Sequence, residues 1–467
     1  FDAVPLDPKT WRESFERHRP QLFFCESAWS GIDPVRRPWK GQVYGSVRFP
    51  KENRTALLAI LEHCRREGIP TIFWNKEDPT HFPDRVHDFV DTAKRFDVVF
   101  TTAAECVEGY RREHGCRNVF ALPFATQPRL FNPIETGPRS SNIVFAGSWY
   151  AQHRQRSIDM EAMLDRLVED GFTLEIIDRH AGNGDPNHRF PDRYHPFIRP
   201  GVPHDQMAAV YKSSRFGLNF NTVIDSPTMF ARRVFELMSS NTLVVSNHAR
   251  GIEEMFGDMV VFPDREPGRL KALDVGEIDA MRERALAEVL AKHTYRHRWE
   301  EILRNAGFAF TPAGDALTVV VPVASRDEAQ GAIRAFEARN YADARLLLLV
   351  AAEVPDVEVP LYYEAFNRFG VTVTATAYID RYAPERRIPI DTPNAILARP
   401  DALPPRAWVE RAIPHLAYAG DLVMSAASGS GDRYRSAAGR KGEPLLARSA
   451  RLAGLVSGAP PETVYYV

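Results

Sequence analysis

Short apolar runs alternate with helical patterns along most of this chain, and this alternation constrains its fold more than any other feature. Strands are predicted at 21–27, 70–75, 98–102, 119–123, 142–148, 173–179, 216–221, 243–246 and 259–262. Helices are predicted between them at 51–67, 104–114, 157–170, 204–214 and 277–304. Strands separated by helices are typical of parallel sheets with helices on their faces. We therefore expect an α/β protein.

The length of 467 residues predicts two or three domains, because a chain of this size rarely packs around one core. A run rich in Pro, Asn, Gly and Ser at 127–141 indicates a linker. A third α/β pattern follows Thr311, with strands at 317–323, 344–350 and 371–377 and a helix at 325–340. We predict domains at 1–140, 141–310 and 316–467, and a mobile loop at 426–441.

Composition excludes some classes of protein and partner. Lys and Arg total 59 against 61 Asp and Glu, so a general nucleic-acid-binding surface is not expected. The four cysteines have neither CxxC spacing nor a disulfide framework, which fits a reducing compartment. No apolar run approaches the ~20 residues of a membrane span, and no signal peptide is visible. We expect a cytoplasmic protein. Whether it associates peripherally with a membrane, and whether residues precede Phe1, stay open.

The segment from Ser226 to Glu236 predicts an anion site. Ser226 is a good N-cap and Pro227 suits a first helical turn, so a helix is expected to begin here. Its free N–H groups attract anions. Thr228, Arg232 and Glu236 are spaced four residues apart and would share one helix face, with Arg233 beside them. Together these side chains could bind a phosphate at one end of the face and a ribose at the other. A surface Arg232–Glu236 pair on an ordinary helix is the alternative.

The sequence then adds a resemblance. Arg233-Val-Phe-Glu236, a turn of small residues, the strand 243–246 and Gly251-Ile-Glu-Glu254 resemble the nucleotide-sugar half of GT-B glycosyltransferases. They are most similar to the CgeB-like (spore maturation protein type) branch of the group 1, GT4-like enzymes. The resemblance implies a GT-B fold of two Rossmann-like domains, with Glu236 on the nucleotide ribose. Many group 1 enzymes have a second Glu where this chain has Thr228, so the donor sugar cannot be carried over.

Other donor-side residues follow predicted strands. Gly147 permits close approach of the backbone to a diphosphate, Ser148 adds a donor, and Arg154 or Arg156 would neutralise phosphate charge. Asn219 lies on a strand face beside the expected donor. A plain strand-to-helix turn at Gly147 is the alternative.

Acceptor-side candidates follow two strands of the first domain. Trp29, Ser30 and Gly31 come after the first strand, where a turn with a packed tryptophan is the alternative. The run 76–81 contains Lys76, Glu77, Asp78 and His81, a density of titratable groups that indicates a site. The general base is expected to be Asp78, then Glu77, then His81. A solvated Asp-Pro loop is the alternative, and CgeB-like proteins have a similar acidic segment.

No metal is expected. His293 and His297 have i, i+4 spacing but lack the Glu of HExxH, so partly buried structural histidines are expected. GT-B enzymes generally need no bound metal, because a helix dipole and basic side chains offset the diphosphate charge. In these enzymes the last helix commonly packs back onto the first domain, and 277–304 suits that position.

The segment 316–467 resembles the opening of a family 2 GT-A glycosyltransferase through its strands 317–323 and 346–350. Only Asp401 remains of the acidic metal motif, so a degenerate, non-catalytic GT-A-like domain is expected. We predict a metal-independent hexosyl- or related transferase (EC 2.4 class) in glycan biosynthesis, with a nucleotide diphosphate sugar as donor and a saccharide or glycan as acceptor. The alternatives are a non-catalytic carbohydrate- or nucleotide-binding scaffold, or catalysis by the C-terminal domain. Nucleotide, sugar, stereochemistry and oligomeric state stay open.

Overall fold

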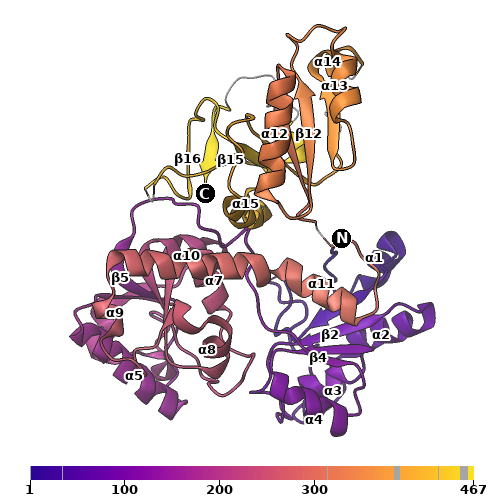
Figure 1. The fold of residues 1–467 in the computed structure, drawn as a ribbon. Coiled ribbons are helices and arrows are strands. Elements are labelled where there is room, and N and C mark those ends of the chain that lie inside the picture. Colours follow the sequence, from indigo (N-terminus) through magenta and orange to yellow (C-terminus); the bar gives the residue numbers. More distant parts are fainter. Residues whose placement is uncertain (1, 34, 313, 383–389, 430, 453–460) are drawn as a thin grey trace. The chain divides into compact units, whose positions relative to one another are not determined.

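The computed structural model describes residues 2–33, 35–312, 314–382, 390–429, 431–452 and 461–467 (Figure 1). Contacts between Cα atoms divide the chain into two compact units, 1–127 with 139–310 and 128–138 with 311–467. The first unit contains both predicted N-terminal domains. The predicted linker belongs largely to the second unit, where the backbone N–H of Glu135 donates to the Tyr434 carbonyl. No helix in the described part of the chain is long and apolar enough to cross a membrane.

The first sheet has four parallel strands in the order β1-β2-β3-β4. Its strands are β1 (Phe23–Glu26), β2 (Thr71–Asn75), β3 (Val98–Thr101) and β4 (Val119–Ala121). The accompanying helices are α1 (Trp11–His18), α2 (Thr55–Glu67), α3 (Phe89–Ala93) and α4 (Val107–Arg112). Helix α2 buries Leu57, Ile60, Leu61 and Cys64, the i, i+3, i+4, i+7 spacing of one apolar face. Burial of such side chains, at about 1.5–3 kcal/mol each, fixes α2 to the sheet.

The second sheet has six parallel strands in the order β10-β9-β8-β5-β6-β7. Its strands are β5 (Ser140–Phe145), β6 (Leu174–Asp178), β7 (Ile198–Pro200), β8 (Ser214–Asn219), β9 (Leu243–Ser246) and β10 (Val260–Val261). The helices are α5 (Arg154–Glu169), α6 (Met207–Lys212), α7 (Arg233–Ser239), α8 (Arg250–Phe256) and α9 (Arg269–Ala272). Numbered within the sheet, this order is 6-5-4-1-2-3, the doubly wound order of the Rossmann fold. The expected α/β class with two Rossmann-like domains is confirmed.

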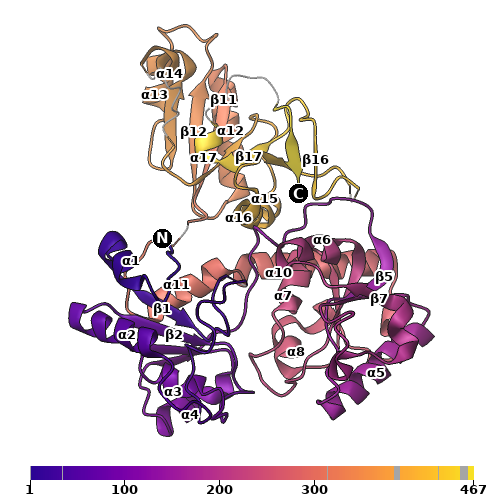
Figure 2. The ribbon, with the colours of Figure 1, turned by 180° about the vertical axis from the view of Figure 1, so that it is seen from behind.

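The predicted helix 277–304 is two helices, α10 (Val275–Lys292) and α11 (Tyr295–Asn305). The chain is extended at Thr294, which forms a capping box with His297 and starts α11 as a separate helix. Figures 1 and 2 show α11 against the first sheet. There Ile302 packs in a cluster with side chains of β2 and β3, and Arg298 donates to the Pro123 and Phe124 carbonyls at 2.8 and 2.9 Å. The expected return of the last helix to the first domain is therefore confirmed.

The second unit contains an eight-stranded mixed sheet in the order β13-β12-β11-β14-β17-β15-β18-β16. The strands are β11 (Leu317–Val323), β12 (Ala344–Val350), β13 (Val371–Ala375), β14 (Asn394–Leu397), β15 (Met424–Ser425), β16 (Arg435–Ala437), β17 (Leu445–Arg448) and β18 (Val464–Tyr466). The helices are α12 (Arg326–Arg339), α13 (Val359–Phe366), α14 (Thr376–Tyr382), α15 (Arg406–Ala412), α16 (Leu416–Ala419) and α17 (Ser449–Leu452). The first four strands of that order are parallel, and β14 pairs with β17 antiparallel.

Two local predictions are wrong. The segment 426–441 contains β16, which pairs antiparallel with β18, so it is not a loop throughout; Ser430 lies outside the described residues. The helix expected from Ser226 begins only at Arg233, with Arg232 at its N-cap. Tertiary contacts override the local cap signal: the Asn221 side chain accepts from the Ala231 N–H at 3.0 Å, which holds the preceding segment out of the helix.

Candidate functional site

The second sheet has a topological switch point between β5 and β8. Chain connections leave these neighbouring strands in opposite directions, and ligands of open α/β sheets bind outside the carboxyl ends of strands at this point. Gly147 and Ser148 follow the end of β5, and Asn219 ends β8. All three residues therefore lie at the carboxyl ends of β5 and β8, beside the switch point.

A pocket of about 340 Å³ lies beside these strand ends. It contains four of the predicted donor-binding residues, Gly147, Ser148, Arg156 and Arg233. The full lining is Phe145, Ala146, Gly147, Ser148, Tyr150, Arg156, Ile177, Arg179, Gly201, Val202, His204, Met207, Phe220, Ala231 and Arg233. The described lining thus has three arginines and no carboxylate, which suits an anionic ligand.

The glycine and serine after β5 have different constraints. A Cβ at Gly147 would lie 2.3 Å from the Phe145 ring, so a larger residue would displace that ring from the pocket wall. The Ser148 hydroxyl is buried and donates to Asp178 Oδ1 at 2.8 Å. Gly147 therefore makes room for the Phe145 ring. Ser148 ties β5 to the end of β6, so the expectation that its hydroxyl donates to a ligand is wrong in this structure.

Two guanidiniums line this pocket, and each lies over an aromatic ring. Arg156 lies 5.1 Å from the Tyr150 ring centroid, and its Nε donates to Thr222 at 3.1 Å. Arg233 lies 5.5 Å from the Phe145 centroid, donates weakly to Asn219 Oδ1 at 3.4 Å, and has a buried Nε without a hydrogen-bond partner. Burial, together with the charge of Arg233, lowers the pKa of Arg156. Within the described residues, neither guanidinium pairs with a carboxylate.

Glu236 is buried at the start of α7 with both carboxylate oxygens in contact with neighbours. Arg232 Nε donates to Oε1 at 2.7 Å and the Tyr211 hydroxyl to Oε2 at 3.3 Å. Burial opposes the charge of Arg232, but Glu236 and Tyr295 more than offset this and raise its pKa. The predicted Arg232–Glu236 pair is present. Tyr211 and Tyr295 were missed, because nothing in the sequence shows that α6 and the start of α11 meet α7.

Thr228 does not lie with these groups. Its hydroxyl donates to the Thr102 carbonyl at 2.7 Å and accepts from the Ala104 N–H at 2.9 Å, both just after β3. Ser226 similarly donates to Glu105 at 2.9 Å. The expectation that Thr228 shares a helix face with Arg232 and Glu236 is wrong, because this segment is fastened to the first domain instead.

The acceptor-side candidates gather at the carboxyl ends of β1 and β2. Trp29 Nε1 donates to Glu77 Oε1 at 3.0 Å, and Lys76 forms an ion pair with Glu26 at 2.7 Å. Ser30 accepts from Arg37 at 2.8 Å. Gly31 has φ of +87°, and a Cβ there would lie 2.9 Å from the Trp39 ring. The structure thus places Trp29, Ser30, Gly31 and Lys76 in the two loops that follow β1 and β2.

Asp78 and Glu77 differ sharply in environment. Asp78 has no exposed surface and receives hydrogen bonds from Asn75 at 2.8 Å, Thr101 at 2.7 Å and Tyr110 at 3.0 Å. Burial, partly opposed by these donors, raises its pKa to about 7. Glu77 is only partly buried, and burial raises its pKa. Of these two carboxylates, Glu77 is therefore the one with exposed surface.

The histidines of the chain differ in whether they could bind a metal ion. His293 contacts Arg298 at 3.1 Å and His297 contacts Thr294 at 2.9 Å, so both are structural, as predicted. Among the described residues, only the group His81, Asp84 and His87 has the geometry to hold an ion. Asp401 is exposed and paired with Arg399.

One protein family and several solved structures are similar to parts of this chain. Residues 154–304 match a family described as glycosyl transferase-like. No match was found among the curated proteins. Solved structures similar to the chain include an alpha-glucosyltransferase in complex with UDP and a 13-mer DNA (11% identity, 56% of this chain and 77% of that one, TM-score 0.40). A second is a glycosyltransferase from Rickettsia africae ESF-5, with 12% identity over 56% of this chain and 82% of that one and a TM-score of 0.40. A third is TarM, with 12% identity over 55% of this chain and 59% of that one and a TM-score of 0.35.

Proposed function

We propose that this protein is a glycosyltransferase that moves a sugar from a nucleotide diphosphate sugar to a saccharide or glycan acceptor. One observation carries the proposal: Arg156 and Arg233 face a pocket at the switch point of a Rossmann-like sheet, without a carboxylate in its described lining. The family match over 154–304 includes α5 and α7, the helices that supply both arginines.

The diphosphate is the part of the donor that this pocket suits best. Two neighbouring guanidiniums repel each other when desolvated, and a bound diphosphate reverses that cost by pairing with both. The partnerless Nε of Arg233 supplies one of the donors. Because the leaving diphosphate is neutralised by arginine here, we propose that donor binding needs no metal ion.

Glu236 is proposed to bind the ribose. From the described residues, its Oε2 receives only the long hydrogen bond of Tyr211, at 3.3 Å, so a ribose hydroxyl can take that position. Arg232 then orients the carboxylate through Oε1. This assignment retains the role that the GT-B resemblance implies for Glu236.

Glu77 is proposed as the general base for the acceptor hydroxyl. Its carboxylate is partly buried, and a raised pKa strengthens a carboxylate as a base. Trp29 fixes its orientation through the indole N–H and offers a half-exposed aromatic face for a sugar ring. Asp78, the first choice from sequence, instead holds the loop from within.

A thermal-shift screen of the full chain with UDP-, GDP-, CMP- and dTDP-linked sugars tests the proposal. A donor at 100 times its Kd adds roughly 2.7 kcal/mol of stability, which raises the unfolding midpoint by several degrees. The Arg156→Ala/Arg233→Ala double variant should lose the shift. Arg269→Ala, an exposed arginine of the same domain, should retain it.

The outcome also separates the rival functions. No shift with any nucleotide sugar would contradict donor binding and favour a scaffold with decayed transferase folds. A shift that survives in the double variant would place the donor elsewhere, with the C-terminal domain as the next candidate.

A further inference from the structure

A second group of polar side chains occupies the loop that joins β2 to α3. The sequence His81-Phe-Pro-Asp84-Arg-Val-His87 places two imidazoles three residues on either side of a carboxylate. His81 Nδ1 lies 2.8 Å and His87 Nδ1 lies 3.0 Å from the same oxygen, Asp84 Oδ2. One potential ligand atom from each residue lies within 4.8 Å of the others. Three side chains that are each partly buried thus converge on one point.

These separations are close to those of a metal coordination shell. Bonds of about 2.0–2.2 Å to imidazole nitrogen and carboxylate oxygen place neighbouring ligand atoms roughly 3–3.6 Å apart. The two measured Asp84 distances need only a small expansion to reach that range. Two imidazoles and one carboxylate suit Zn²⁺ and similar transition metals, whereas Mg²⁺ and Ca²⁺ prefer oxygen ligands.

The surroundings of the triad fix its side chains. Asp84 Oδ1 accepts the Val86 N–H at 2.7 Å, which leaves Oδ2 directed at both imidazoles. The Trp29 ring contacts the edges of both histidine rings, at centroid distances of 5.5 Å for His81 and 5.1 Å for His87. Ligand residues held in this way lose little conformational entropy when an ion binds.

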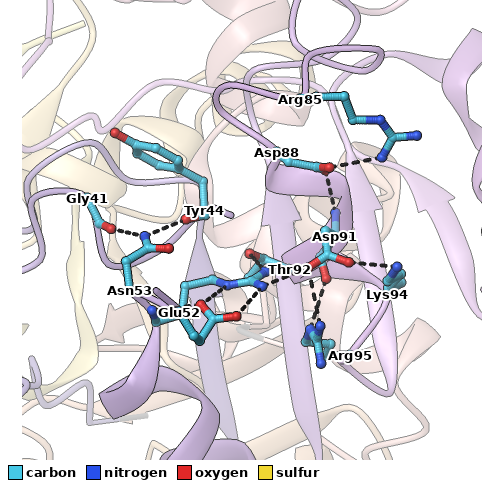
Figure 3. A network of polar contacts seen from close by, with 11 residues as sticks. Gly41, Tyr44, Glu52, Asn53, Arg85, Asp88, Asp91, Thr92, Lys94 and Arg95 are labelled. Carbon is cyan, nitrogen blue, oxygen red and sulfur yellow. Dashed lines mark hydrogen bonds and ion pairs between the residues drawn. The ribbon is translucent and has the colours of Figure 1, made fainter. Parts of the chain in front are cut away.

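The loop is also anchored immediately after His87. Backbone hydrogen bonds join Asp88 and Gly45 in both directions, at 2.8 and 3.1 Å. Figure 3 shows the polar network at this point, in which Asp88 contacts Arg85 and caps α3 through Asp91. The triad therefore lies on a loop whose far end cannot shift freely.

We propose that His81, Asp84 and His87 bind one divalent transition-metal ion of the Zn²⁺ type. The ion would brace the 76–88 loop, and with it Trp29 and Glu77, which are joined by the indole hydrogen bond. It lies in the first domain and is separate from the donor pocket, so it does not replace the arginines that bind diphosphate. Three protein ligands leave at least one coordination position for water.

The alternative is a purely hydrogen-bonded triad, in which both Nδ1 atoms donate to Asp84. The two arrangements differ in the response to metal, so the test uses tag-free, EDTA-treated full-length chain titrated with ZnCl₂ in a calorimeter. We expect one Zn²⁺ per chain and a higher unfolding midpoint with the ion. MgCl₂ and CaCl₂ should produce neither effect.

Variants locate the ion. His81→Ala, His87→Ala and Asp84→Asn should each lose most of the Zn²⁺ binding, while His18→Ala, an exposed histidine of the same domain, should bind one equivalent. If the variants unfold, Co²⁺ added to the wild-type chain supplies a second readout. We expect visible absorption bands of four- or five-coordinate Co²⁺, which should disappear when Zn²⁺ displaces the Co²⁺ ion.

Clear results overturn the proposal. Absence of stoichiometric Zn²⁺ binding and of Co²⁺ bands in the wild-type chain would establish the hydrogen-bonded triad. Binding that is unchanged in folded His81→Ala/His87→Ala would place the ion elsewhere. Nucleotide-sugar shifts are expected to be the same with and without Zn²⁺, so failure here does not touch the donor assignment.

Discussion

The strand ends of the two sheets in the first unit bury charge in opposite ways. After β2, Asp78 is wholly buried and receives three hydrogen bonds. After β5 and β8, Arg156 and Arg233 lie on aromatic rings, and one buried Nε of Arg233 has no partner. A buried carboxyl group whose hydrogen bonds are satisfied holds a loop in place, whereas an incompletely paired guanidinium is free to take a ligand. Under the proposed function, the same sheet position therefore serves structure in one domain and recognition in the other.

The largest expected effect tests which carboxylate of the first domain does chemistry. Glu77→Gln should reduce turnover by roughly 10²–10⁴-fold, because the amide cannot accept the acceptor proton. The affinity for the donor, measured by calorimetry, should stay unchanged, while initial rates measure the loss of turnover. Glu113→Gln, an exposed glutamate of the same domain, is the matched control. Full activity in Glu77→Gln would contradict its assignment as the base.

The next effect tests Asp78 as a structural group. Its folded pKa of about 7 lies above its ordinary value of 3.8, so the folded state binds the extra proton and stability falls as pH rises from about 4 to 7. This loss is on the order of 4 kcal/mol. Asp78→Asn should remove that slope and gain stability relative to wild type at pH 8. Denaturant unfolding of the wild-type chain and of Asp78→Asn at pH 5 and pH 8 measures the pH dependence of stability and the gain at pH 8. The same pH dependence in both proteins would refute the raised pKa.

A smaller effect is expected on the donor side. Glu236→Ala should cost about 1.5–3 kcal/mol of nucleotide affinity, as a charged hydrogen bond to ribose would. Arg233→Ala should weaken nucleotide diphosphates more than nucleosides, because its partner is phosphate. Titration calorimetry with UDP and uridine distinguishes the two residues. Equal losses for both ligands in Arg233→Ala would contradict the phosphate role.

The smallest effect concerns the second unit. Asp401→Ala should leave turnover of a small acceptor nearly unchanged, because Asp401 is one exposed carboxylate already paired with Arg399. EDTA should also leave the affinity for nucleotide diphosphate unchanged. If Asp401→Ala abolished turnover and EDTA did the same, catalysis would belong to the C-terminal domain.

Much of the fold was readable from periodicity and turn residues. The strands at 243–246, 317–323 and 344–350 coincide with β9, β11 and β12, because buried parallel strands are continuous apolar runs. The helix expected from Ser226 failed because Asn221 and the chain after β3 compete for its backbone and side-chain groups. Long-range partners of this kind leave no local signal.

The candidate site was predictable to the same extent. Gly147 and Glu77 follow the ends of β5 and β2, and Arg156 and Arg233 lie in the first turns of α5 and α7, near the carboxyl edge where such sheets bind ligands. Asp78 is buried and Glu77 is only partly buried, which is why we propose Glu77 as the base. The sequence of two adjacent loop residues does not show which of them is buried. The His-x₂-Asp-x₂-His spacing was visible in the sequence, but it resembles no common zinc motif and became meaningful only once the loop geometry was known.

The return of α11 has a consequence for synthesis of the protein. Ile302 completes an apolar cluster with Ile72, Trp74, Phe100 and Leu122, the last of which precedes it by nearly two hundred positions. A ribosome takes about 10–40 s to cover that interval. Throughout this time the nascent first sheet has one face without its native cover. Chaperone binding to stalled chains should therefore concentrate on lengths that expose β2 and β3 but withhold α11, and cease once residue 305 has emerged.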